Sequence, residues 1–115
     1  MEILKVENLS VAFKGIFGKV LAVNDLSFQM NKGECVCIVG ESGSGKSVTA
    51  KAIMKTLEDN ARIDSGRILF DSTDLIQMKE NSMRKIRGKR IALVYQNPLS
   101  ALNPCYTVYK QMREV

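Results

Sequence analysis

The strongest constraint on the fold of this chain is a glycine-rich loop, GESGSGKS, which runs from Gly40 to Ser47 directly after the apolar run CVCIV. The loop fits the pattern G-x-x-x-x-G-K-[S/T]. The residues that follow, Lys46–Leu57, place apolar side chains at helical spacing and contain neither glycine nor proline. A strand, a glycine loop and a helix in this order are the setting in which such a loop binds phosphate. The alternative, a glycine turn that only caps a helix, would not need a lysine and a hydroxyl at fixed positions.

The chemistry of phosphate explains the residue types in this loop. Phosphate oxygens need several converging backbone N–H donors, and glycine permits this approach because it lacks a Cβ and accepts positive φ angles. The helix N-terminus adds free N–H groups and a partial positive charge. We expect Lys46 to contact the β- and γ-phosphates and the Ser47 hydroxyl to coordinate Mg²⁺. The predicted nucleotide-binding residues of the loop are Gly40, Glu41, Ser42, Gly43, Ser44, Gly45, Lys46, Ser47 and Val48.

Short apolar runs rich in β-forming residues predict the strands. The first two are separated by a short connection and could pair antiparallel, whereas the third leads through the glycine loop into a helix. This order predicts an α/β fold with a mixed β-sheet and a phosphate-loop helix, in one domain without an internal boundary. The predicted strands span residues 2–13, 21–28, 34–40, 66–71 and 90–95.

Composition narrows the class of protein. The chain has 115 residues, of which 45% are hydrophobic and 25% charged, as expected for one globular unit. We see neither a signal peptide at the N-terminus nor a run of about 18 apolar residues, so a membrane role would have to act through a partner. Five of the seven residues from 84 to 90 are basic. Without interleaved aromatic residues, this run indicates a solvated helix face rather than a nucleic-acid site.

The cysteines give little support for a disulfide or metal framework. Cys35, Cys37 and Cys105 are too few and too unevenly spaced for a set of disulfides, which favours a reducing compartment. Cys35 and Cys37 fall in the apolar run before the loop, and no further cysteine or histidine lies nearby to complete a ligand set. We therefore expect both to be buried strand residues.

A phosphate loop does not select a base, so the base must be recognised elsewhere. Phe13 is a candidate because it ends a predicted strand, where its ring could stack on a purine. From the residues alone, an ordinary core aromatic is an equally good interpretation. Gln96, which follows the last predicted strand, would on the same grounds be an ordinary polar residue.

The order of four segments resembles the ATP-binding subunit of an ABC transporter. These are the aromatic Phe13, then AVNDLSFQMNKGECVCIVGESGSGKS, SGRILFDSTDL and IALVYQNPLSALNP. Within that family, GESGSGKSVTAKAIM and YQNPLSALNP look most like subunits for uptake of oligopeptides, dipeptides or nickel. The resemblance implies that Phe13 stacks on adenine. It also implies that Gln96 is the Q-loop glutamine, which reaches Mg²⁺ and the attacking water, beside a loop that contacts the membrane-spanning subunit.

The resemblance covers residues 1–115 as the N-terminal part of a single ABC ATP-binding domain. Neither an LSGGQ-like signature nor a Walker B strand is found, and the chain has no histidine to act as the family's switch histidine. Val48 replaces a Thr or Ser that is common after the loop, and Ser72 replaces a turn glycine. The catalytic residues implied within this part are Lys46 and Gln96, and the Mg²⁺ ligands are Ser47 and Gln96.

The implied function is ATP binding and, in the full-length protein, ATP hydrolysis that energises import of peptides or a related solute. The implied partners are transmembrane permease subunits, a second ATP-binding subunit and, indirectly, a solute-binding protein, with no nucleic acid. The implied location is cytoplasmic, on the inner face of the cytoplasmic membrane. One alternative is a truncated nucleotide-binding module without turnover. Another is a small-molecule kinase or GTPase, against which the Q-loop segment and the lack of N-K-x-D argue.

Overall fold

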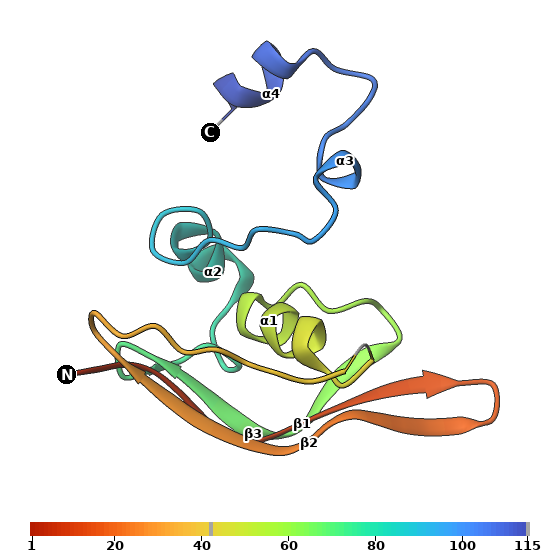
Figure 1. Ribbon diagram of the computed structural model, residues 1–115, viewed down its shortest axis with the longest axis vertical. Coiled ribbons are helices and arrows are strands. Elements are labelled where there is room, and N and C mark those ends of the chain that lie inside the picture. Colours follow the sequence, from red (N-terminus) through yellow and green to blue (C-terminus); the bar gives the residue numbers. More distant parts are fainter. Residues whose placement is uncertain (42, 115) are drawn as a thin grey trace.

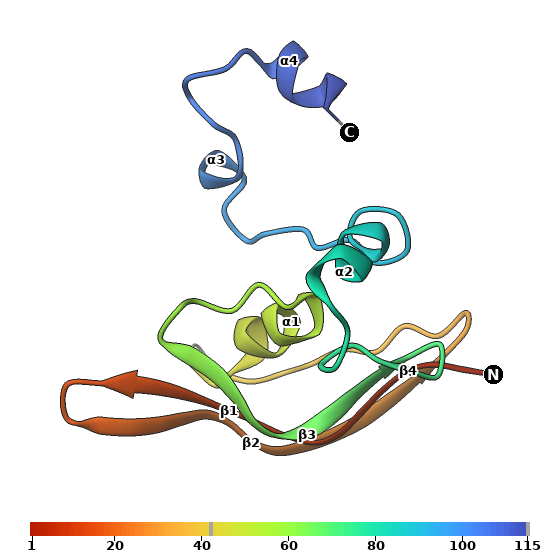
Figure 2. The ribbon, with the colours of Figure 1, turned by 180° about the vertical axis from the view of Figure 1, so that it is seen from behind.

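The computed structural model describes residues 1–41 and 43–114, which build one antiparallel sheet with a helix on its concave face (Figures 1 and 2). The sheet has the strand order β2-β1-β3-β4. Helices α3 and α4 extend away from the sheet in both views. The strands are β1 (Glu2–Gly15), β2 (Gly18–Asn31), β3 (Ala61–Phe70) and β4 (Thr73–Asp74), and the helices are α1 (Lys46–Met54), α2 (Glu80–Ile86), α3 (Pro98–Ala101) and α4 (Val108–Arg113).

The strands predicted over 2–13, 21–28 and 66–71 are confirmed. Strands β1 and β2 form a long hairpin whose last ladder pair is Gly15 with Gly18, so that Ile16 and Phe17 form its two-residue turn. The ladder also contains a β-bulge, because Val11 pairs with Val23 whereas the next residue, Ala12, pairs with Leu21. Ala22 is thus an extra residue in β2. Such bulges bend a strand and increase its twist.

The curvature of the sheet also depends on a close crossing of β1 and β3. Gly66 has a φ of +104°, and a Cβ placed there would lie 2.6 Å from both the Asn8 carbonyl oxygen and the Leu9 Cα. Only glycine fits this position, because a side chain would meet backbone atoms on the neighbouring strand. The bend gives the sheet the concave face on which α1 lies.

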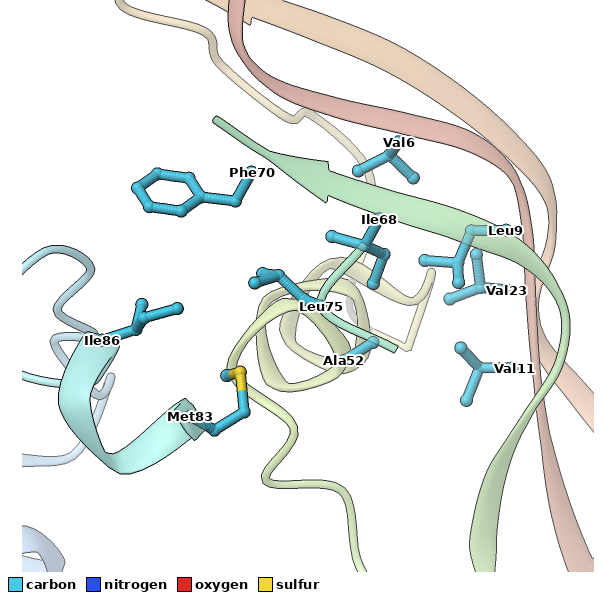
Figure 3. Close-up of a cluster of buried hydrophobic side chains, with 10 residues drawn as sticks. All are labelled: Val6, Leu9, Val11, Val23, Ala52, Ile68, Phe70, Leu75, Met83 and Ile86. Carbon is cyan, nitrogen blue, oxygen red and sulfur yellow. The ribbon is translucent and has the colours of Figure 1, made fainter. Parts of the chain in front are cut away.

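The core lies between this concave face and the helices α1 and α2 (Figure 3). Leu9, Ile68, Leu75 and Met83 are completely buried, and Ala52 brings α1 close to the strands because its side chain is small. These contacts fix the axis of α1, and with it the position of the glycine loop at its N-terminus. The core residues are Val6, Leu9, Val11, Val23, Ala52, Ile68, Phe70, Leu75, Met83 and Ile86.

Two predicted strands, 34–40 and 90–95, are wrong for this structure. Neither segment forms a ladder, and the second makes only one isolated parallel β-bridge, between Arg87 and Ile91. Val39 and Val94 are 89% and 92% exposed. A strand is stable only when a neighbour accepts and donates its backbone hydrogen bonds, and the described residues provide none for these two segments. The α/β class holds, but every strand pairing in the described sheet is antiparallel.

Two further expectations need correction. Cys35 and Cys37 are exposed rather than buried, because the segment that carries them lies outside the sheet. The helix predicted to reach Leu57 ends at Met54. Lys55 adopts a left-handed conformation with a φ of 54°, and its N–H bonds back to the carbonyl oxygen of Ala52. This is the usual geometry of a helix C-terminus. None of the helices in the described residues has the length and apolar character needed to cross a membrane.

Candidate functional site

The glycine loop forms the N-terminus of α1 with the backbone angles that the sequence predicts. Gly43 and Gly45 have φ angles of +83° and +95°, and Gly45 is the N-cap residue of the helix. Positive φ angles next to a helix N-terminus turn successive N–H groups toward one side, which creates a concave site for an anion. The first turn of α1 contains no acidic residue that would oppose an anion.

Gly45 is required by its surroundings as well as by its φ angle. A Cβ at this position would lie 2.5 Å from the carbonyl oxygen of Ala22 and 3.3 Å from Cγ2 of Val23. Ala22 is the bulge residue of β2, so the bulge brings the strand backbone against the loop. Ala22 could not be singled out from the sequence, because a bulge depends on the register of two strands and has no signature in one of them.

Lys46 points its ammonium group into the loop. Its Nζ donates to the carbonyl oxygens of Gly40 and Glu41, the second at 3.1 Å. The loop is closed further by the Ser44 N–H, which donates to the Glu41 oxygen at 3.1 Å. Carbonyl oxygens are neutral acceptors, and a phosphate oxygen makes a stronger, charge-assisted hydrogen bond with an ammonium group. The lysine is therefore placed to exchange these carbonyl oxygens for a phosphate group. Ser42, also predicted to bind nucleotide, lies outside the described residues.

A cavity of about 450 Å³ opens in front of the loop. It is bounded by the loop, by the first turn of α1, by the bulge of β2 and by one residue that is distant in sequence, Gln96. Small-molecule sites in proteins commonly have volumes of about 300–1,000 Å³. The residues that line it are Ala22, Gly43, Ser44, Gly45, Lys46, Ser47, Val48 and Gln96.

Gln96 and Ser47 share this cavity with Lys46, as their predicted roles require. A hydroxyl and an amide carbonyl are hard oxygen ligands, which suit Mg²⁺, and this ion usually takes few ligands from the protein and the rest from phosphate and water. The residues present therefore fit a magnesium–phosphate group. Within residues 1–41 and 43–114, no cluster of three or more His, Cys, Asp or Glu side chains could hold a metal ion.

Phe13 is not among the residues that line this cavity. It is half-buried on β1 and pairs with Val20 of β2 and Ala61 of β3. An adjoining cavity of about 360 Å³ runs from the loop along β2 and is lined by Leu21, the neighbour of Val20. Phe13 is thus one ladder position away from a hollow that is continuous with the loop, and its stacking on a base remains a prediction.

The carboxyl groups with the clearest pKa changes lie outside the cavity. A hydrogen bond from Lys51 lowers the pKa of Glu58, and one from Arg87 lowers the pKa of Glu80. Glu7 has a lowered pKa because Lys5 and Arg67 both donate to it. None of these carboxyl groups lines the cavity, where Lys46 is the charged residue.

Comparison with known proteins adds three findings from sequence. Residues 23–114 match the family model described as ABC transporter. The oligopeptide transport ATP-binding protein OppD and the dipeptide transport ATP-binding protein DppD of Bacillus subtilis are 44% and 46% identical over 114 residues, which is 98% of this chain and 32% and 34% of theirs. The glutathione import ATP-binding protein GsiA of Escherichia coli O157:H7 is 44% identical over 118 residues, covering 97% of this chain and 19% of that protein.

A solved structure is also similar. It is the crystal structure of a nucleotide-free ATP-binding cassette from an ABC transporter, with a TM-score of 0.62 and 25% sequence identity over 99% of this chain and 46% of that one. The chain thus spans about a third of the length of the two Bacillus relatives.

Proposed function

Since the chain belongs to the ABC transporter family, we propose that residues 1–115 are the N-terminal part of one ATP-binding domain and bind ATP with Mg²⁺. The observation that carries this proposal is the shared cavity of the glycine loop, Lys46, Ser47 and Gln96. The loop and helix N-terminus supply N–H donors, and Lys46 supplies a positive charge. These groups complement a chain of phosphates and leave the base to other residues.

The proposed roles divide between binding and chemistry. Lys46 would neutralise phosphate charge, and the Ser47 hydroxyl oxygen would coordinate Mg²⁺. Gln96 lines the same cavity, and its amide oxygen would help to hold Mg²⁺ and to orient a water molecule. Phosphoryl transfer depends on positioning and charge stabilisation together. Residues 1–115 contain the phosphate site and Gln96, and the remaining parts of a hydrolytic site would come from further sequence.

For the whole protein, we propose ATP hydrolysis that energises import of a peptide or a related solute. The names of the relatives support this direction, because they are ATP-binding proteins for oligopeptide, dipeptide and glutathione transport. Such a subunit would work on the cytoplasmic side of the membrane with permease subunits and a second ATP-binding subunit. The second candidate is a nucleotide-binding module without turnover, which is favoured by the absence of a Walker B strand, signature and histidine from the 115 residues.

Calorimetric titration of the chain with ATP and Mg²⁺, with circular dichroism to verify folding, tests the proposal. We expect binding by the unmodified chain, none by the Lys46→Ala variant, and ATP binding with a weaker Mg²⁺ response by Gln96→Ala. A folded chain that does not bind ATP would refute the proposal. Steady ATP turnover by contaminant-free protein would refute the module without turnover, and tighter binding of GTP than of ATP would favour a GTPase.

A further inference from the structure

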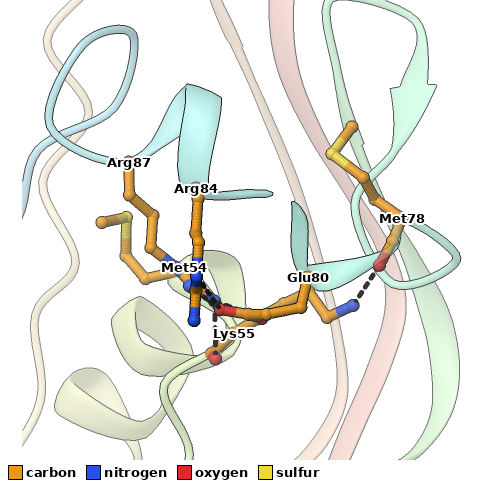
Figure 4. Close-up of polar contacts among 6 residues, drawn as sticks. All are labelled: Met54, Lys55, Met78, Glu80, Arg84 and Arg87. Carbon is orange, nitrogen blue, oxygen red and sulfur yellow. Dashed lines mark hydrogen bonds and ion pairs between the residues drawn. The ribbon is translucent and has the colours of Figure 1, made fainter. Parts of the chain in front are cut away.

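The C-terminal end of α1 is fastened to α2 by one arginine (Figure 4). Arg87 donates through Nε to the Met54 carbonyl oxygen at 2.7 Å and through Nη2 to the Lys55 carbonyl oxygen at 3.0 Å. The same guanidinium group binds both carboxylate oxygens of Glu80, at 2.5 and 3.3 Å. Its side chain is only 22% exposed. Charge-assisted, bidentate contacts of this kind fix geometry more strictly than single hydrogen bonds.

Arg87 also stands at the start of the segment that ends in Gln96. The chain turns after Arg87, where the Gly88 N–H donates to the Ile91 carbonyl oxygen at 2.8 Å. The backbones of Arg87 and Ile91 also form an isolated parallel β-bridge. Residues 92–95 then run without regular secondary structure to Gln96. A cavity of about 290 Å³ separates Leu93–Gln96 from Lys46–Lys51 of α1. The segment is therefore anchored at its beginning rather than along its length.

We infer that Arg87 is a positioning residue for Gln96. Arg87 holds the C-terminal carbonyl groups of α1 and simultaneously begins the segment that carries Gln96. It thus sets the distance between this glutamine and the phosphate loop at the other end of the same helix. The inference rests on the proposed function, because the distance between Gln96 and the loop matters only if the loop binds ATP. The distance itself can be measured without nucleotide.

The arginine is not needed to form either helix. The last turn of α1 is closed by its own backbone, since the N–H groups of Lys55 and Thr56 bond to the carbonyl oxygens of Ala52 and Lys51. Helix α2 is held to the core by Met83 and Ile86, which are 0% and 8% exposed. What the guanidinium group adds is a fixed relation between the two helices. A lysine has one ammonium group on a flexible stem and could not satisfy these four acceptors at once.

The first test compares Arg87→Met with Arg84→Met, a matched control three residues earlier in α2. Arg84 is 74% exposed and reaches Glu80 only at 4.0 Å. The ATP affinity of each variant is measured by titration twice, once with Mg²⁺ and once with a chelator in place of Mg²⁺. Without Mg²⁺, we expect the ATP affinity of Arg87→Met to stay within about twofold of that of the unmodified chain. The gain in ATP affinity on adding Mg²⁺ should be smaller in Arg87→Met by about fivefold or more, because the two groups are coupled. Adding Gln96→Ala to Arg87→Met should have no further effect on that gain, and Arg84→Met should behave as the unmodified chain.

The second test measures the position directly, so that it does not depend on nucleotide binding. Spin labels are placed at Lys51→Cys and Val94→Cys in a chain whose native cysteines are replaced by serine, and the distance between them is recorded without nucleotide. Arg87→Met should broaden the distance distribution, Glu80→Gln should broaden it less, and Arg84→Met should leave it unchanged.

An unchanged distribution in a folded Arg87→Met chain would overturn the inference. Equal loss of ATP affinity with and without Mg²⁺ would do the same. If the unmodified chain does not bind ATP while the distribution still depends on Arg87, the proposed function alone fails.

Discussion

Replacing Gly45 by alanine tests whether the bulge of β2 shapes the phosphate loop. Two costs are expected. A left-handed backbone conformation costs a residue with a side chain about 1–2 kcal/mol. The new Cβ would also lie 2.5 Å from the Ala22 carbonyl oxygen. That oxygen cannot retreat easily, because the β2 residues on either side of Ala22 are paired with β1. Overpacking of this kind adds about 1–3 kcal/mol, so the free energy of unfolding should fall by about 2–5 kcal/mol in total.

Gly43→Ala is the matched control for this substitution. Its φ angle of +83° is similar, but a Cβ there would have nothing within 4 Å. Only the backbone cost of about 1–2 kcal/mol should remain. Urea denaturation followed by circular dichroism measures both variants under the same conditions. Equal losses of stability would refute the reasoning that a contact with Ala22 constrains Gly45, whereas a larger loss for Gly45→Ala would support it.

Three other predictions concern the core, the surface charges and the base. Ile68→Ala should lower the free energy of unfolding by about 2–5 kcal/mol because Ile68 is fully buried, whereas Ile16→Ala, at a residue 97% exposed, should change it by less than about 0.5 kcal/mol in urea denaturation. Arg87 lowers the pKa of Glu80 from its usual 4.5, so the stabilisation from this pair is complete above pH 4.5 and is lost as the pH falls through the lowered pKa. The difference in urea midpoint between the unmodified chain and Glu80→Gln should therefore shrink in acid. A difference that stays constant with pH would contradict this sign. Phe13→Ala should weaken ATP binding by about 1–3 kcal/mol in calorimetry if the ring stacks on adenine, and an unchanged affinity would assign Phe13 to packing alone.

The features that could be predicted from the sequence are those whose causes are local. The glycine loop, the start of the helix at Lys46 and three of the four sheet strands follow from residue types and spacing, and the structure contains all of them; the two-residue strand β4 was not predicted. The membership of Gln96 in the site depended on a resemblance, since its own neighbours give no chemical reason for it. The structure then placed it in the cavity with Lys46 and Ser47.

What could not be predicted depends on partners that are distant in sequence. The runs around Cys35 and Val94 have the composition of strands, but a strand also needs neighbours, and composition does not provide them. The bulge at Ala22 arises from the register of β1 against β2, and the contacts of Arg87 with α1 join residues that are 32 and 33 positions apart. Arg87 was only one of several basic residues in its run, and nothing in that run distinguishes it from Arg84.

The contacts of Lys46 have a consequence for selectivity. Its ammonium group already has two backbone oxygens as partners, so every anion that enters the loop competes with them. A singly charged ion such as chloride would offer the ammonium group one weak contact in place of its two hydrogen bonds to carbonyl oxygens. A chain of phosphates offers several charged oxygens at once, and the N–H groups of the loop bind the same oxygens. The carbonyl oxygens of Gly40 and Glu41 thus compete with any anion for the ammonium group of Lys46. This competition favours anions that carry several negative charges over singly charged ones.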